Sequence, residues 1–276
     1  MECDFFMYGS IVALITPFDN DNNIDYEEVK RLCDYHLENK TDGLLLLGTT
    51  AEAEALSDDE KYNLVKYIYE YINGRIKLML GLISNKYEEV IHQADMLKEF
   101  DIDSYLVIAP YYVKSNDSGL LKYFTFIADR VNRPIVIYNV PKRCGFNISF
   151  EVIKALSYHK NIIGIKEATS DPIQLLGLIN LSNDNFKIYC GDDSMMLIAM
   201  MLGAEGCINV IGNAFPLEIK LIIDSIKKNP DIAKTTFYKL FNLMNCMYKE
   251  VSPIGIKYIM YYYIIRIRGK VSASGK

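Results

Sequence analysis

The sequence predicts an α/β fold, a (β/α)8 barrel with a small helical extension at its C-terminal end. Three features predict it: short apolar runs recur eight times, helical patterns lie between them, and the repeat length is roughly 20 to 35 residues. This order matches a closed barrel better than an open doubly wound sheet. No Gly-x-Gly-x-x-Gly turn follows the first run, which also disfavours a dinucleotide-binding fold.

The predicted strands are short and rich in β-branched and apolar residues, as buried parallel strands are. They are Ser10–Thr16, Gly43–Leu47, Lys77–Leu82, Tyr105–Ala109, Pro134–Tyr138, Ile162–Lys166, Phe186–Cys190 and Gly206–Val210.

Between the strands, apolar residues recur at helical spacing over Asp25–Asn39, Ser57–Ile72, Tyr87–Phe100 and Gly119–Val131. Start signals support this assignment. Ser57 with Glu60 has the spacing of a capping box, and Asp171-Pro172 places an N-cap residue before a proline at the first helical position.

We assign residues 1–225 to the barrel and residues 226–276 to the helical extension. After about residue 225 the pattern is helical only, over Asp231–Met247 and Ile254–Ile267. This extension is too short for an independent domain and is expected to pack on the barrel. The last residues, 266–276, are basic and then small and polar, and we assign them no function.

Composition excludes several classes of protein. Half of the 276 residues are apolar and the net charge is −5, with basic residues interspersed among acids, so a nucleic-acid partner is not expected. No apolar stretch reaches the about 20 residues that span a bilayer, and the N-terminus lacks signal-peptide features. We therefore expect no membrane association and a cytoplasmic location.

Cysteine and histidine spacing predicts neither a disulfide framework nor a metal site. The six cysteines are scattered without a Cys-x-x-Cys pair, and the three histidines are isolated from one another. We expect reduced thiols, no metal and no cofactor.

The most informative residue is Lys166, which ends the apolar run Ile162–Ile165. Lysine is normally exposed, so a buried strand that delivers one to the mouth of a barrel indicates a cationic or nucleophilic task. A lysine whose pKa is lowered by apolar walls or nearby cations attacks ketones to form a Schiff base. With 30 Lys and Arg residues, a lysine after a strand also arises by chance. Whether Lys166 is a nucleophile is therefore judged from the residues at the other strand ends.

Two other strand ends fit the same chemistry. Tyr138 ends the strand beside that of Lys166, within reach of an adduct on the lysine if both point inward, and its phenol suits proton transfer. Gly48-Thr49-Thr50 offers a flexible backbone and two hydroxyls that suit a small carboxylate. Each also has a purely structural explanation: Tyr138 as a tyrosine packed in the core, and the threonines as caps of the segment that follows the turn.

Arg143 follows Tyr138 in the loop Pro141–Gly145, where its planar guanidinium suits a second carboxylate. A solvated loop arginine is the alternative. Cys144 stands beside two cations but has no base partner in the sequence, so we assign it no catalytic role.

Together, Gly48–Glu52, Tyr138–Gly145, Gly164–Glu167 and Gly191-Asp192-Asp193 resemble motifs of the dihydrodipicolinate synthase branch of the pyruvate-dependent class I aldolases. The resemblance runs from about Gly9 to Pro216. It implies that Lys166 forms a Schiff base with pyruvate and that the enamine attacks aspartate semialdehyde, giving 4-hydroxy-tetrahydrodipicolinate on the route to lysine and diaminopimelate. It also implies a homotetramer, a dimer of dimers.

The resemblance implies roles for further positions. Thr49, Tyr138 and Tyr112 form a hydroxyl relay, with Tyr112 reaching into the neighbouring subunit's site. Thr50 binds the pyruvate carboxylate and Arg143 the semialdehyde carboxylate, while the backbone around Gly191 and Ile208 lines the pocket.

Some positions depart from the family pattern. Ala51 and Cys144 replace a usual glycine and threonine, and the C-terminal segment looks short and atypical. Asn85, Glu89 and Tyr111 match residue types of a lysine-binding allosteric site, whereas positions 53, 54, 58 and 61 do not match it. Since Lys61 would repel a cationic ligand, we expect weak or absent inhibition by lysine.

Three functions remain open from the sequence. The leading one is the synthase, because Thr49 and Arg143 favour that branch over the sialic acid lyase branch. The second is another pyruvate aldolase, of the 2-keto-3-deoxy sugar acid or sialic acid lyase type. The third is a catalytically silent paralogue, since a fold alone does not establish activity.

Overall fold

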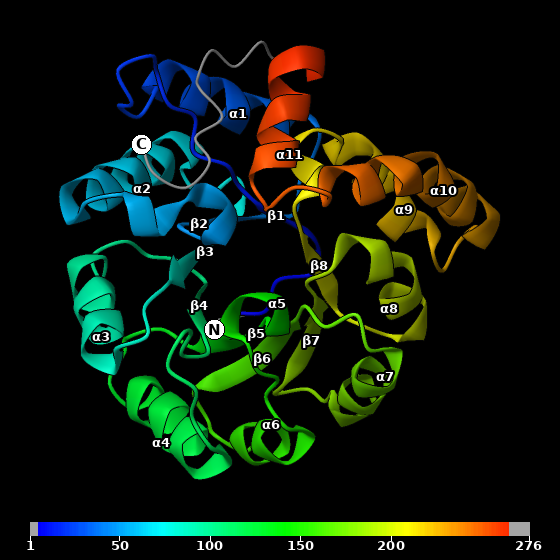
Figure 1. The fold of residues 1–276 in the computed structure, drawn as a ribbon. Helices are drawn as coiled ribbons and strands as arrows, with labels where there is room; N and C mark the ends of the chain where they lie inside the picture. The colour runs from blue at the N-terminus through cyan, green and yellow to red at the C-terminus, as the bar shows by residue number, and fades with distance from the viewer. Residues whose placement is uncertain (1–4, 265–276) are drawn as a thin grey trace.

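The computed structural model describes residues 5–264 and shows a closed, all-parallel barrel of eight strands in sequence order, ringed by helices (Figure 1). The strands are β1 Gly9–Ala13, β2 Gly43–Leu46, β3 Lys77–Leu82, β4 Ser104–Ile108, β5 Ile135–Asn139, β6 Ile162–Glu167, β7 Lys187–Cys190 and β8 Gly206–Asn209. The predicted (β/α)8 fold is confirmed. Pairing of Gly9 with Gly206 and of Val12 with Asn209 closes the sheet between β1 and β8.

The helices between strands cover the outer face of the barrel, so the strands are buried on both sides. They are α1 Tyr26–Glu38, α2 Asp58–Ile72, α3 Tyr87–Met96, α4 Asp117–Ala128, α6 Phe150–Leu156, α7 Pro172–Leu181 and α8 Met196–Leu202. Helix α9 Pro216–Ser225 follows β8 and packs against β1, whereas the one-turn helix α5 Pro141–Cys144 lies at the end of the barrel. Two further helices follow the barrel: α10 Pro230–Met247 and α11 Ile254–Ile259.

Side chains at the helix starts explain where the helices begin. The Ser57 hydroxyl accepts from the Glu60 N–H while the Glu60 carboxylate accepts from the Ser57 N–H at 2.8 Å, so the predicted capping box is present. Asp171 accepts from the Ile173 N–H ahead of Pro172, as its sequence predicts. Each pairing satisfies a backbone donor that the helix itself leaves free.

Differences from the predicted boundaries are small and local. The first strand ends at Ala13 instead of Thr16, and α3 ends at Met96 instead of Phe100. The segment predicted as a loop, Pro141–Gly145, forms the one-turn helix α5, which Gly145 ends with a φ of +75°. Proline at the first helical position and glycine after the last favour such a short helix.

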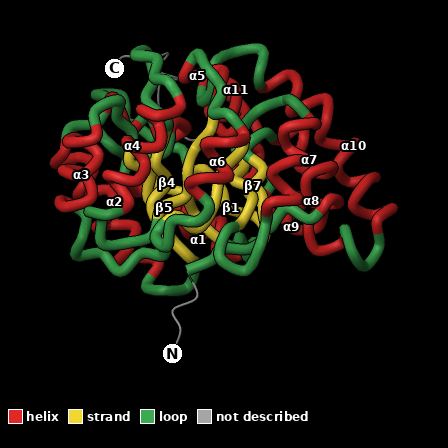
Figure 2. The backbone as a smooth tube through the Cα atoms, turned by 90° about the horizontal axis from the view of Figure 1, so that it is seen from below, coloured by secondary structure: helices red, strands yellow, loops and turns green. Residues whose placement is uncertain are grey.

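Residues 226–264, the described part of the chain after the barrel, pack on the barrel helices. Helix α10 lies along α9 and also contacts α8. Helix α11 returns toward the carboxyl ends of the strands, where Lys257 contacts Glu52 after β2. In Figure 2, α5 and α11 lie at the same end of the molecule, above the strands. The predicted helix Ile254–Ile267 is α-helical to Ile259 and a π-helix over Met260–Ile264. Its predicted last residues, 265–267, and the tail after them lie outside the described residues.

Candidate functional site

Lys166 is the second-last residue of β6, near the carboxyl end of the strand, and its side chain is only 4% exposed. Its Nζ is 4.4 Å from the centroid of the Tyr138 ring on the neighbouring strand, since the two residues are register partners between β5 and β6. Burial lowers the pKa of Lys166 from 10.5 to about 8, and the Arg143 cation acts in the same direction, while Asp193 and Cys190 oppose it. Roughly one amine in ten is therefore neutral at pH 7, against fewer than one in a thousand for a free lysine.

Gly191 makes room for the Lys166 side chain. It follows β7, and its N–H donates to the Glu167 carbonyl at 2.7 Å. A Cβ at this position would lie 2.9 Å from both Cγ and Cε of Lys166, closer than real Cβ contacts come. A side chain at this position would therefore displace Lys166 from the place it occupies.

Tyr138 is almost fully buried, and burial raises its pKa to about 12. Arg143 and a hydrogen bond with the Thr49 side chain act in the opposite direction. The phenol is therefore protonated at neutral pH, so it enters a reaction as a proton donor. A cation formed on Lys166, only 4.4 Å from the ring, would favour its ionisation afterwards.

Thr49 and Thr50 lie on a 3₁₀ turn, Thr49–Ala51, directly after β2. Thr50 is 3% exposed, and the Thr16 hydroxyl donates to the Ala51 carbonyl at 2.8 Å, which ties this turn to the segment after β1. The threonine hydroxyls thus lie in a fixed turn at the barrel mouth.

Ile208, a further predicted pocket residue, is fully buried in β8, two strands from β6.

Arg143 lies on α5 at the rim of the barrel and is exposed. Its Nη2 donates to the Ser252 carbonyl at 2.8 Å, a residue of the segment between α10 and α11. The cation acts on the pKa of both Lys166 and Tyr138. It is therefore placed to meet an anion that enters the mouth.

Tyr112 does not join this buried set within the chain. It is 91% exposed and has a φ of +68°, a conformation that non-glycine residues adopt rarely. Its neighbour Val113 is 62% exposed. Both project from the loop after β4.

Of the predicted allosteric residues, Asn85 and Tyr111 are in contact with each other. The Asn85 side chain donates to the Tyr111 carbonyl at 3.5 Å. Burial raises the pKa of Tyr111, and its phenol pairs with Glu54. Glu89 lies close to Asp58 and His92.

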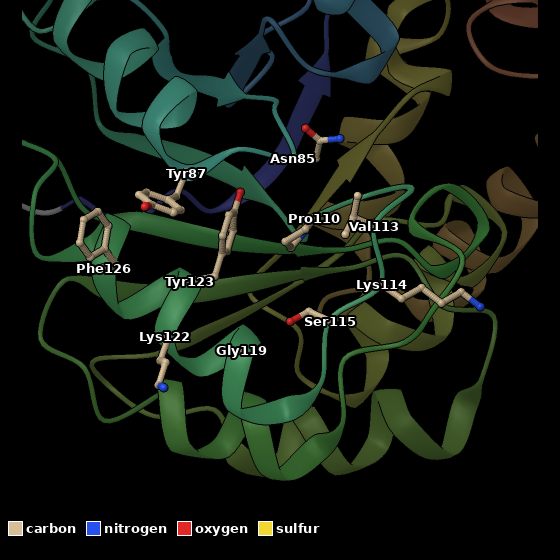
Figure 3. A pocket seen from close by; sticks show the side chains of 10 residues that line it. All are labelled: Asn85, Tyr87, Pro110, Val113, Lys114, Ser115, Gly119, Lys122, Tyr123 and Phe126. Carbon is tan, nitrogen blue, oxygen red and sulfur yellow. The ribbon is translucent and has the colours of Figure 1, made fainter.

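A pocket of about 420 Å³ opens next to Asn85, between α3, α4 and the loop after β4 (Figure 3). Two lysines, Lys114 and Lys122, are among its lining residues, and the Tyr87 and Phe126 rings pack edge to face with centroids 4.8 Å apart. None of Lys166, Tyr138, Thr49 or Arg143 lines it, so it is separate from the lysine site.

The sequence did not assign a role to Asp193, although it was noted within Gly191-Asp192-Asp193. Its buried carboxylate accepts from the N–H groups of Val210 and Ile211 and from the Tyr248 hydroxyl at 3.0 Å. Burial raises its pKa to about 6. Because Asp193 raises the pKa of Lys166, it limits how far burial lowers that pKa.

Glu167 is another residue without a predicted role. Its carboxylate accepts from Asn139 Nδ2 at 2.9 Å, from the Thr169 N–H at 2.8 Å and from Gln174 Nε2 at 3.0 Å. The bond from Asn139 joins the ends of β5 and β6, the strands that carry Tyr138 and Lys166, and the other two tie the end of β6 to the segment that follows it. A carboxylate next to a motif lysine was the available signal, but Asn139, its partner on the neighbouring strand, is 28 positions away in sequence.

Within residues 5–264, the trio Asp58, Glu89 and His92 brings potential metal-ligand atoms within 4.8 Å of one another. His92 Nε2 already pairs with Asp58 at 3.2 Å, and these side chains are partly or fully exposed. The expectation of no metal stays a prediction.

Comparisons with known proteins agree with one another. The Dihydrodipicolinate synthetase family model matches residues 7–268. A 4-hydroxy-tetrahydrodipicolinate synthase of Pelobacter propionicus is 37% identical over 250 residues, covering 90% of this chain and 86% of that protein. One of Phocaeicola vulgatus is 39% identical, covering 90% of this chain and 84% of its own.

Solved structures give the same result. The chloride-inhibited dihydrodipicolinate synthase of Acinetobacter baumannii, complexed with pyruvate, superposes with a TM-score of 0.90 at 34% identity, covering 93% of this chain and 88% of that one. Sequence and structure together show that this chain belongs to the dihydrodipicolinate synthetase family.

Proposed function

We propose that this protein is a lyase that condenses pyruvate with L-aspartate 4-semialdehyde to give 4-hydroxy-tetrahydrodipicolinate, in lysine and diaminopimelate biosynthesis. The observation that carries the proposal is the buried Lys166 amine, whose pKa is lowered to about 8 beside the Tyr138 phenol. Relatives with that named activity match nine-tenths of this chain.

The geometry supports a specific order of proton transfers. The neutral Lys166 amine attacks the ketone carbon of pyruvate, and Tyr138 donates the proton with which the carbinolamine hydroxyl leaves as water. The cationic imine then favours loss of a methyl proton, which gives the enamine nucleophile. Thr49, hydrogen-bonded to Tyr138, continues the relay.

The enamine carbon next attacks the aldehyde carbon of the semialdehyde and forms the new carbon–carbon bond, while the aldehyde oxygen takes a proton back from Tyr138 and becomes the hydroxyl group. The amino group of the bound product then displaces Lys166 from the imine carbon, which closes the ring and frees the lysine. One water is lost overall, at imine formation. Thr50 is proposed to hold the pyruvate carboxylate and Arg143 that of the semialdehyde, with Gly191 and Ile208 lining the pocket.

We propose that the protein assembles as a homotetramer, a dimer of dimers. Exposed apolar side chains gather on the neighbouring helices α7 and α8: Ile173, Leu176, Ile198, Met201 and Leu202. Tyr112 and Val113 are also exposed, and they lie in the loop that leads from β4 to α4. Figure 1 shows α3 and α4 across the barrel from α7 and α8. Two separate apolar regions support two kinds of contact between copies, with Tyr112 crossing one of them.

We also propose a cytoplasmic location. The five cysteines within the described residues are all free thiols, as a reducing compartment favours. In the part of the chain that the structure covers, no helix has the length and hydropathy to cross a membrane.

We propose that Asn85, Glu89 and Tyr111 form a degenerate allosteric site. The Tyr111 phenol is engaged by Glu54, and Lys61 lies 3.5 Å from Asp58, within the group of side chains around Glu89. A ligand ammonium would meet the Lys61 cation there.

The value of kcat/KM for pyruvate is expected to depend on the Lys166 proton. Because the amine must be neutral, kcat/KM should rise about tenfold per pH unit below pH 8 and level off above it. The measurement is an assay coupled to the next reductase, with Lys166→Ala as the inactive control. A profile that still rises steeply above pH 9 contradicts a lowered lysine pKa, and an active Lys166→Ala removes the mechanism.

Replacing Arg143 should separate the synthase from other pyruvate aldolases. Arg143→Ala is expected to lower kcat/KM for the semialdehyde roughly 10- to 100-fold, since charge-assisted hydrogen bonds to a carboxylate are lost. Lys142→Ala is the control. Lys142 is on the same short helix as Arg143, and its exposed amine lies 3.6 Å from Asp192. Equal kinetics of both variants with the semialdehyde would favour a different second substrate.

The oligomer proposal predicts a tetramer in analytical ultracentrifugation. Ile173→Lys places a charge on the α7–α8 surface, where the side chain is 78% exposed, and is expected to give dimers with an unchanged thermal midpoint. A wild-type monomer would contradict the proposal, as would a variant that remains tetrameric.

Lysine should inhibit weakly or not at all. In a steady-state titration, millimolar L-lysine is expected to leave most of the rate intact. If Lys61→His creates sensitivity that the wild type lacks, the Lys61 cation is the cause. Tight inhibition of the wild type would refute the expectation.

A further inference from the structure

A buried ion pair joins the catalytic turn to the last helix. Glu52 and Lys257 are 205 positions apart in sequence, and their side chains, in direct contact, are 9% and 8% exposed. Lys257 Nζ also lies 4.4 Å from the centroid of the Phe18 ring. A carboxylate and an ammonium removed from water in this way require each other, since either one alone would be an uncompensated buried charge.

Glu52 has an unusual backbone conformation. Its φ of 57° and ψ of 36° lie in the left-handed region, and it joins the turn Thr49–Ala51 to the turn Ala53–Ala55. Its N–H donates to the Thr49 carbonyl at 3.2 Å. A non-glycine residue keeps this conformation only where its surroundings determine it, and the contact with Lys257 fixes the side chain.

The turn that Glu52 closes carries two site residues. Thr49 is hydrogen-bonded to Tyr138, and Thr50 is buried beside it. A displacement of this turn would move the hydroxyl relay relative to Lys166, and reacting groups tolerate little misplacement.

The segment that carries Lys257 contacts two other parts of the site. Between α10 and Lys257, the Ser252 carbonyl accepts from Arg143, and the Tyr248 hydroxyl donates to Asp193. Residues 248–257 therefore contact the site at three points. In Figure 2, α11, which carries Lys257, lies at the same end of the molecule as α5.

We propose that Glu52 and Lys257 are positioning residues for the condensation: their ion pair holds the Thr49–Thr50 turn in register with Tyr138 and Lys166. The inference rests on the proposed function. Neither side chain touches the reacting atoms; both act through the turn. The pair makes the helical extension part of the site's geometry.

The test compares Glu52→Gln, Lys257→Met and the double variant as full-length proteins. Each single variant is expected to lose at least tenfold in kcat and to raise KM for pyruvate, because Thr49 and Thr50 shift. The double variant should be no worse than the worse single variant, since both changes remove one interaction. Lys257→Arg, which retains a cation, should recover most of the kcat.

Glu205→Gln is the matched control. Glu205 pairs with Lys187 at 3.3 Å, the pair is 23% and 15% exposed, and Lys187 Nζ lies 5.4 Å from the Phe6 ring centroid. These residues stand at the amino-terminal ends of β7 and β8, away from the strand ends that carry the site. This variant should keep the kcat and KM of the wild type.

Lower thermal midpoints with unchanged kcat and KM would overturn the proposal, as would additive effects in the double variant. If the single variants do not fold, Glu52→Asp decides: the pair persists but the shorter side chain pulls the turn, so kcat should fall with little change in thermal midpoint. Wild-type kinetics in Glu52→Asp would then reject the positioning role. Wild-type protein that neither condenses the substrates nor traps pyruvate under borohydride would instead reject the proposed function, and this role with it.

Discussion

The site depends on one constraint, the burial of the Lys166 amine inside a closed barrel. A charged ammonium is poorly solvated there, so its pKa falls to about 8 and a usable fraction is neutral at physiological pH. Three neighbouring residues determine the position and the pKa of the buried amine. Gly191 leaves space for the side chain, Tyr138 covers it, and Asp193 limits the fall in pKa.

Burial acts in opposite directions on the two main groups. It lowers the pKa of the lysine and raises that of Tyr138 to about 12, so the resting site pairs an available nucleophile with a protonated phenol. Attack followed by loss of water requires this combination. Once Tyr138 has given its proton to the leaving water, the imine cation beside it stabilises the phenolate, which can then accept the methyl proton in the following step.

Much of the fold could be predicted because apolar periodicity reports burial directly, and all eight strands appear where the runs lie. Lys166 and Tyr138 were accessible for the same reason, since each ends a strand. Asp193, Glu167, Glu52 and Lys257 were not given roles. Their importance comes from contacts between distant segments, such as the one that joins Glu52 to Lys257, and no local pattern encodes such a contact. The short helix α5 was missed for another reason: its local signals, Pro141 and Gly145, enclose a single turn, which is too short to show helical periodicity.

The account's central claim is that Lys166 is the nucleophile that captures pyruvate. The most direct measurement is reduction of the folded protein with borohydride in the presence of pyruvate, followed by mass spectrometry of its peptides. The account predicts one stable pyruvate-derived adduct per chain, on the peptide that contains Lys166, and none without pyruvate. An unmodified Lys166 peptide, or an adduct confined to another lysine such as Lys257, would contradict it.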